Sequence, residues 1–221
     1  MTSDQQLQQA VLRELAWDTR VDAARIGVTV TNGVVTLTGT VPSYAERLAA
    51  QEAAHRVAGV LDVANDLEVV PSGALTRTDT AIAQAVRHAL EWDALVPDER
   101  IQSTVADGWV TLEGTVDYWH QRVDAERAVR NLAGVRGVTN RIVVSAPAVE
   151  AAKIQAEIEQ ALERRAERTA KRIQVTVQDG TVTLTGRVRS LAEKRAIIGA
   201  VHGTPGVRAV HDQLVIDLTE A

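Results

Sequence analysis

Apolar and polar residues alternate along short segments of this chain. In its last third, residues 173–178 and residues 181–188 both alternate, and Asp179-Gly180 separates the two segments. A period of two residues is typical of a β-strand with one buried face. Aspartate followed by glycine tolerates the positive φ angles that a two-residue type I′ turn requires at both central positions. The pattern therefore predicts a β-hairpin.

The hairpin pattern occurs three times, and the spacing within each copy is the same. The turns are Asn32-Gly33, Asp107-Gly108 and Asp179-Gly180, and the Gly-Val pairs that follow them are Gly59-Val60, Gly134-Val135 and Gly206-Val207. The second copy is offset from the first by 75 residues, and the third from the second by 72. Length changes are therefore confined to the linkers, and the chain is predicted to contain three copies of one structural unit.

An amphipathic helix is predicted on each side of every hairpin. Leu7, Val11 and Leu15 recur at four-residue spacing before the first hairpin, which indicates one apolar stripe. After the hairpin, Ser43 and Glu46 match a capping box, in which the serine accepts from a free amide and the acid reaches back. The corresponding residues of the later copies are Ile82, Val86 and Leu90, then Ile154, Ile158 and Leu162, with Ser190 and Glu193. The glycine of each Gly-Val pair suits a left-handed cap at the end of the second helix.

A third alternating segment closes each copy, so that the unit reads αββαβ. A strand–helix–strand crossover usually makes its two strands parallel, which predicts a mixed sheet. The fold class is α+β. We expect three tandem αββαβ domains at residues 1–70, 76–145 and 148–217, each with a small mixed three-stranded sheet and two helices packed on one face.

These motifs resemble the BON domain, a family named after bacterial osmotic-shock and nodulation proteins. The hairpin part of the resemblance lies at residues 32–41, 107–116 and 179–188, and the end part at residues 59–67, 134–142 and 206–214. Similar family members are often exported to the envelope and induced by osmotic or other stress. They are associated with anionic phospholipid, with misfolded envelope protein or with potassium sensing in the cytosol. The resemblance implies a binding protein of this kind.

Composition and charge narrow the expected location and partners. The chain has no Cys, and its N-terminus begins with Met1 and lacks a basic segment followed by an apolar one. We therefore expect a cytoplasmic protein without a transmembrane segment. Residues 1–74 carry nine acids and five bases, whereas residues 147–221 carry ten acids and eleven bases. The net charge of −5 does not favour nucleic acid as a partner, but the third copy differs from the others.

The sequence gives little support for catalysis. None of the five histidines has metal-ligand spacing with another histidine or a carboxylate, so no catalytic residue, metal or cofactor is predicted. Asn65, Asn140 and Asp212 share the strand parity of the apolar residues around them, and we expect them to bond backbone at the sheet margin. A cation-binding role is the alternative. Arg25, Arg100 and Arg172 each lie immediately before a first strand, and we expect a packed stem with a solvated or acid-paired head, with anion contact as the alternative.

Basic residues around the first helix of the third copy are candidates for contact with an anion. They are Arg164, Arg165, Arg168, Lys171 and Arg172. Glutamates lie among them, so one interpretation is a solvated face. The other is contact with an anionic partner such as lipid headgroups, nucleic acid or an acidic protein surface.

Aromatic residues suggest a second kind of surface. The second copy contains Trp109, Tyr118 and Trp119, which are candidate interface residues facing either a sister domain or an external partner. Trp17 and Trp92 occupy equivalent positions at the end of the first helix, where the third copy has Arg164. The simplest expectation is that both tryptophans cover the open end of a small core, and the alternative is a domain or partner contact.

Together these features predict a non-enzymatic tandem-domain binding or adaptor protein of a bacterial osmotic or envelope stress response. Its third domain would contact anionic phospholipid or a client protein. The alternative is a cytosolic potassium-responsive binding protein. The sequence leaves self-association open.

Overall fold

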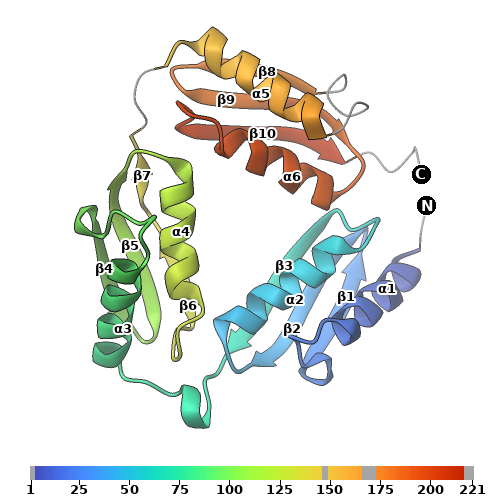
Figure 1. Ribbon diagram of the computed structural model, residues 1–221. Coiled ribbons are helices and arrows are strands. Elements are labelled where there is room, and N and C mark those ends of the chain that lie inside the picture. Colours follow the sequence, from blue (N-terminus) through green and yellow to red (C-terminus); the bar gives the residue numbers. More distant parts are fainter. Residues whose placement is uncertain (1–2, 146–148, 166–172, 217–221) are drawn as a thin grey trace.

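A computed structural model describes residues 3–145, 149–165 and 173–216 (Figure 1). The first domain contains α1 (Asp4–Trp17), β1 (Ile26–Thr31), β2 (Val34–Val41), α2 (Tyr44–Arg56) and β3 (Asp62–Val69). The second contains α3 (Asp79–Trp92), β4 (Ile101–Ala106), β5 (Trp109–Val116), α4 (Trp119–Arg130), β6 (Gly137–Asn140) and β7 (Val143–Val144). The third contains α5 (Ala151–Arg165), β8 (Ile173–Gln178), β9 (Thr181–Val188), α6 (Leu191–His202) and β10 (Ala209–Ile216). Short 3₁₀ turns are η1 (Ala23–Arg25), η2 (Gly73–Leu75) and η3 (Asp98–Arg100).

Each domain has one mixed sheet whose central strand is the second strand of the hairpin. In the first domain β1 pairs with β2 antiparallel and β3 pairs with β2 parallel, and β8, β9 and β10 repeat this arrangement. In the second domain two short strands, β6 and β7, both pair in parallel with β5. The predicted fold of three tandem α+β domains with mixed sheets is confirmed.

The apolar stripes found in the sequence form a separate core in each domain. Leu7, Val11 and Leu15 of α1 are at most 2% exposed and pack on Val35 and Leu37 of β2. Corresponding residues of α3 with β5, and of α5 with β9, form the second and third cores. Because strand side chains alternate between the two faces, the threonines of β1 and β2 lie on the face away from the helices. A sheet face covered by two helices thus provides the stability of each domain.

The geometry of the turns follows from the residue types. The first residue of each hairpin turn has positive φ, 52° at Asn32, 51° at Asp107 and 49° at Asp179, and each is followed by a glycine that also has positive φ. Gly59, Gly134 and Gly206 also have positive φ, 96°, 89° and 90°, but the prediction that they cap the second helices was wrong, because the C-caps are Val57, Asn131 and Gly203. Each of the three glycines is instead the third residue of the turn that follows the helix, which is closed by a hydrogen bond from the amide of the next valine, and positive φ at this position favours glycine.

Of the two hydrogen bonds in each predicted capping box, only the one accepted by the serine forms. Ser43 accepts a hydrogen bond from the amide of Glu46 at 3.2 Å, and Ser190 accepts from Glu193 at 3.1 Å. The carboxylate of Glu46, however, accepts from the amide of Asp22. It therefore ties the second helix to the loop before β1 instead of completing the box.

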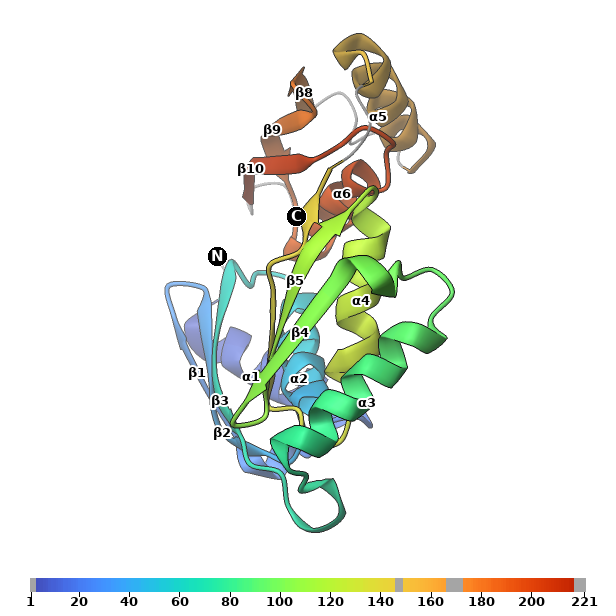
Figure 2. The ribbon, with the colours of Figure 1, turned by 90° about the vertical axis from the view of Figure 1, so that its left-hand side faces the viewer.

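The three domains lie around a common centre, as Figure 1 shows. The second helices α2, α4 and α6 face this centre, and the first helices α1, α3 and α5 lie on the outside of the ring. Figure 2 shows the strands toward one side of the molecule, with α3, α4 and α5 toward the other. Among the described residues, no helix is both long enough and apolar enough to cross a membrane.

Candidate functional site

The basic residues proposed for anion contact fall at the edge of the described chain. Arg164 and Arg165 belong to the last turn of α5, and Arg168, Lys171 and Arg172 lie outside the described residues. The contacts of these side chains therefore stay predictions. The arginines expected to pair with acids do so where they are described. Arg100 makes a two-pronged contact with Asp117 at 2.7 and 3.1 Å, and Arg25 lies 3.1 Å from Asp22.

The three interface aromatics of the second domain lie at two separate places. Trp109 begins β5, whereas Tyr118 and Trp119 follow the end of that eight-residue strand. At about 3.3 Å per residue, the two ends are more than 20 Å apart. Trp109 is 43% exposed and donates from Nε1 to Oγ1 of Thr139 at 2.8 Å. The three residues therefore do not form one aromatic cluster.

Trp119 contacts a sister domain. Its ring stacks on His202 of α6, with the ring centroids 3.6 Å apart and the planes 8° from parallel. The guanidinium carbon of Arg122 lies 4.7 Å from the centroid of the same indole. Tyr118, in contrast, is 43% exposed and stacks on His120 of its own domain. Trp119 is thus a domain-contact residue, whereas Trp109 and Tyr118 present exposed aromatic surface.

Trp17 and Trp92 project into solvent, so the expectation that they cover the open end of a core was wrong. They are 84% and 78% exposed. The reason is helical geometry, because residue 17 lies about 200° around the helix from Leu15, the last residue of the buried stripe. Two large aromatic side chains at equivalent positions are therefore available to a partner.

The polar residues on the third strand of each domain bond backbone at the sheet margin, as predicted. The side-chain amide of Asn65 donates to the carbonyl of Arg47, and Nη2 of Arg47 donates to the carbonyl of Asn65 at 2.7 Å. Asn140 and Arg122 repeat this exchange. In the third domain the pair is ionic, with Nζ of Lys194 2.8 Å from the carboxylate of Asp212. A cation on the second helix thus holds the edge strand in all three domains.

The junctions between the domains repeat one pattern that the sequence reading missed. The first residue of each second helix leans toward the next domain around the ring. Tyr44 packs against the core of domain 2, Trp119 stacks on domain 3, and Leu191 packs against the core of domain 1. Arg136 adds a hydrogen bond from Nε to the carbonyl of Val69 at 3.1 Å. The ring of domains is closed because three head-to-tail contacts return to the start.

A sequence signal for these junctions existed. Tyr44, Trp119 and Leu191 are related by the same offsets of 75 and 72 residues as the hairpins. Each is a large apolar residue at the start of a helix, and this position leaves most of a side chain exposed unless another element covers it. Equivalent apolar residues outside the core stripe therefore indicated a contact between copies.

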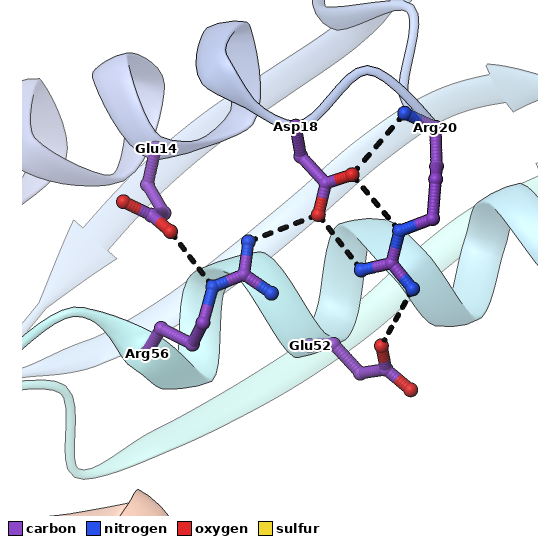
Figure 3. A network of polar contacts seen from close by, with 5 residues as sticks. All are labelled: Glu14, Asp18, Arg20, Glu52 and Arg56. Atoms are coloured by element: carbon purple, nitrogen blue, oxygen red, sulfur yellow. Dashed lines mark hydrogen bonds and ion pairs between the residues drawn. The ribbon is translucent and has the colours of Figure 1, made fainter.

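The space between the two helices differs between the outer domains. In domain 1 five charged residues, Glu14, Asp18, Arg20, Glu52 and Arg56, connect α1 and its following loop with α2 (Figure 3). The Asp18 side chain is 7% exposed, and its hydrogen bonds to Arg20 hold the pKa of its carboxyl well below the usual range. In domain 3 a cavity of about 670 Å³ lies between α5 and α6. Its lining includes Ala161, Gly199, Ala200 and Gly203.

Over residues 3–145, 149–165 and 173–216, no group of three or more histidines and carboxylates could hold a metal ion. The buried polar residues of that part are few, and include His55 and Asp124. Asp124 pairs with Arg127 at 2.6 Å, a structural contact within α4. The features that stand out are therefore contact surfaces and domain junctions.

Comparison with known proteins identifies the repeated unit. The BON domain family matches residues 3–71, 78–146 and 150–217. The chain is 33% identical over 124 residues to Osmotically-inducible protein Y of Escherichia coli (strain K12), a match that spans 54% of this chain and 62% of that protein.

Two solved structures of CdsD, a structural protein of the type III secretion system of Chlamydia trachomatis, are more distant. One is 15% identical, with 96% of this chain and 92% of that chain covered and a TM-score of 0.28. The second, of the C-terminal domain, is 14% identical, with 96% and 97% covered and a TM-score of 0.27. These scores are too low to carry an argument about fold or function.

Proposed function

Because the chain belongs to the BON domain family, we propose that it is a non-enzymatic tandem-domain adaptor of a bacterial stress response that binds anionic phospholipid surfaces. The similarity to Osmotically-inducible protein Y of Escherichia coli supports osmotic stress as the inducing condition. A cytoplasmic location is part of the proposal. Three domains on one body would supply several weak contacts whose combined affinity exceeds that of each.

The exposure of Trp17 and Trp92 carries this proposal. At 84% and 78% exposed, both indoles present apolar surface to water at the same position of two domains. Tryptophan prefers the boundary between lipid headgroups and acyl chains, where its ring is partly buried and its N–H stays hydrated. The equivalent position of the third domain is Arg164, a residue type that binds phosphate. The end of the first helix is therefore the proposed contact position in every domain.

The third domain would bind the membrane mainly through its basic residues. Arg164, Arg165, Arg168, Lys171 and Arg172 bring five cations to the end of α5 and the segment that follows it. Each basic residue near an anionic membrane contributes about 1 kcal/mol, and this attraction is screened over about 8 Å at physiological salt. The tryptophans would contribute binding that salt does not weaken. The proposal thus combines a salt-sensitive and a salt-insensitive part.

Vesicle co-sedimentation separates the two parts. The parent should bind vesicles that contain phosphatidylglycerol better than vesicles of phosphatidylcholine alone, and binding should fall as salt rises. Replacing Arg164, Arg165 and Arg168 by Ser should remove most of the salt-dependent binding. Replacing Trp17 and Trp92 by Ser should weaken binding at every salt concentration.

Matched controls use exposed cations elsewhere. Lys153, at the start of α5, and Arg13, on α1, are both exposed, so Lys153→Ser and Arg13→Ser should leave binding unchanged. Arg20 is unsuitable as a control because it bonds Asp18 and Glu52. If the parent ignores vesicle charge, the phospholipid proposal is wrong. A client protein would then be the better partner, or potassium if the salt alone changes the melting temperature in a cation-specific way.

A further inference from the structure

Each of the two junctions that hold domain 3 contains a histidine, whereas the junction between domains 1 and 2 has an arginine at the equivalent position. The position near the end of each second helix is His55 in α2, Arg130 in α4 and His202 in α6. His202 lies in the junction between domains 2 and 3, and His55 faces Arg195 of domain 3. The junction between domains 1 and 2 has Arg130, a residue type that keeps its charge at all ordinary pH values.

His202 occupies a site suited to a neutral imidazole. It stacks on Trp119 at 3.6 Å, and the guanidinium of Arg122 lies 4.7 Å from the centroid of the same indole. Burial in the junction, reinforced by Arg122, lowers the pKa of His202 to about 4. A protonated ring would gain a cation–π contact with Trp119, but it would lose hydration and face an existing positive charge. The lowered pKa indicates that the loss is larger.

His55 is more deeply enclosed. It is 6% exposed, and its Nδ1 atom is buried without a hydrogen-bond partner. The charged groups that face it are Arg195 of α6, Asp62 at the start of β3 and Glu52 of its own helix. Burial and Arg195 outweigh the two carboxylates, so the pKa of His55 is also lowered to about 4. Protonation would place an imidazolium between α2 and α6, where Leu191 packs against the core of domain 1.

We propose that protonation of His55 and His202 opens the ring and releases domain 3 from domains 1 and 2. Both histidines lie in junctions that involve domain 3, and the remaining junction holds through Tyr44 and the hydrogen bond from Arg136 to Val69. The released form exposes the indole of Trp119 and the side chain of Leu191. Domains 1 and 2 stay together as one body.

The direction in which pH shifts the ring follows from the linkage between histidine protonation and ring opening. Both histidines titrate at about 4 in the closed ring and at about 6.5 once the junctions are open. The open form therefore binds more protons between these values. The preference for the closed ring is fully present above pH 6.5 and declines as the pH falls toward 4.

Small-angle X-ray scattering of the full chain between pH 7.5 and pH 4.5 tests the proposal. The radius of gyration should rise as the pH falls, while circular dichroism shows that the domains remain folded. The double variant His55→Gln, His202→Gln should keep the same radius across this range. The control His211→Gln, at an exposed histidine of β10, should behave like the parent. An unchanged radius in the parent, or equal expansion in the double variant, would overturn the proposal.

A second measurement needs no variant. NMR titration of the parent should place the pKa values of His55 and His202 below 6.5, the ordinary value for histidine. The resonances of Trp119 should change together with the two low values, because its ring leaves His202 when the junction opens. Ordinary pKa values at both histidines would overturn the proposal even if the double variant failed to fold. Neither measurement uses lipid, so the outcome is independent of the vesicle experiment.

Discussion

Domains 1 and 3 share one fold but differ in what lies between their two helices. In domain 1 a network of ion pairs connects α1 with α2, and in domain 3 a cavity of about 670 Å³ lies between α5 and α6. The repeat offsets show how this arises. Glu14, Glu52 and Arg56 of domain 1 correspond to Ala161, Gly199 and Gly203 of domain 3. Long charged side chains in one copy are replaced by the smallest residues in the other.

The comparison shows which positions determine the fold and which are free to vary. The helix stripe and the residues of the central strand that face it are buried in both domains, as Leu15 with Leu37 and Ile158 with Leu184 illustrate. The space between the helices lies outside this core. It can hold charges or a cavity without changing strand order or register. Domain 3 should consequently be the less constrained of the two.

Loss of Asp18 should have the largest effect on this contrast. Its carboxylate accepts from Arg20 and Arg56 at 2.8–2.9 Å, and Asp18→Ala would leave both guanidiniums without their central partner. We expect a loss of about 2 kcal/mol in unfolding free energy, measured by urea denaturation. Asp93→Ala, at the equivalent position of domain 2, removes a single bond from the amide of Leu95 and should cost about 1 kcal/mol. Equal losses of unfolding free energy in the two variants would mean that the ion-pair network adds nothing to stability.

The ion-pair network also predicts that the stabilisation contributed by Asp18 depends on pH. Hydrogen bonds from Arg20 lower the pKa of Asp18 from its ordinary value of 3.8. The stabilisation is therefore present above about pH 4 and is lost as the pH falls further. The difference in stability between the parent and Asp18→Ala should shrink below that pH. A difference that stays constant down to pH 3 would contradict this explanation.

The glycines in the turn after each second helix give a smaller effect that also differs between the domains. Gly59 and Gly206 both have positive φ, so alanine is strained at either position. A Cβ atom at Gly206 would lie 2.8 Å from Cβ of Val149 and 2.9 Å from Cδ1 of Ile154, whereas at Gly59 the nearest atom is 3.6 Å away. We expect Gly59→Ala to cost about 1 kcal/mol and Gly206→Ala about 1.5 kcal/mol in urea denaturation. A larger loss of stability in Gly59→Ala than in Gly206→Ala would contradict the packing argument.

Partial filling of the helix gap in domain 3 should have the smallest effect and the opposite sign. Gly199 lies within α6, and a Cβ atom built there meets nothing within 4 Å. Alanine has the higher helix propensity, so Gly199→Ala should stabilise the protein by about 0.5–1 kcal/mol in thermal unfolding. A destabilised variant would show that the cavity is smaller than the structure indicates.

The local parts of the fold were predictable from the sequence. Asn32-Gly33 specifies its hairpin because both residues tolerate positive φ, and Gly59 specifies a turn for the same reason, although the helix before it ends earlier than predicted, at Arg56. Leu7, Val11 and Leu15 identify the buried face because helical spacing aligns them. Each of these features depends on residues that are close together in the chain.

Trp119 was a candidate for contact with a sister domain or an external partner, but the sequence did not show which residue it meets, because that depends on how separate cores are placed. The stacking of Trp119 on His202 joins residues from different copies, and no local period reveals it. The exposure of Trp17 was also missed, although its position relative to Leu15 could have indicated it. The cations at the end of α5 remain predictions, since Arg168 and the residues that follow it up to 172 lie outside the described part of the chain.

Hydrogen–deuterium exchange on the intact chain at neutral pH tests the contrast between domains 1 and 3 most directly. Both domains are measured in the same molecule, so each serves as the control for the other. Amides of residues 7–15 in α1 should exchange more slowly than those of residues 154–162 in α5, because ion pairs connect α1 with α2, whereas a cavity lies between α5 and α6. Equal protection of the two helices, or slower exchange in α5, would contradict the account.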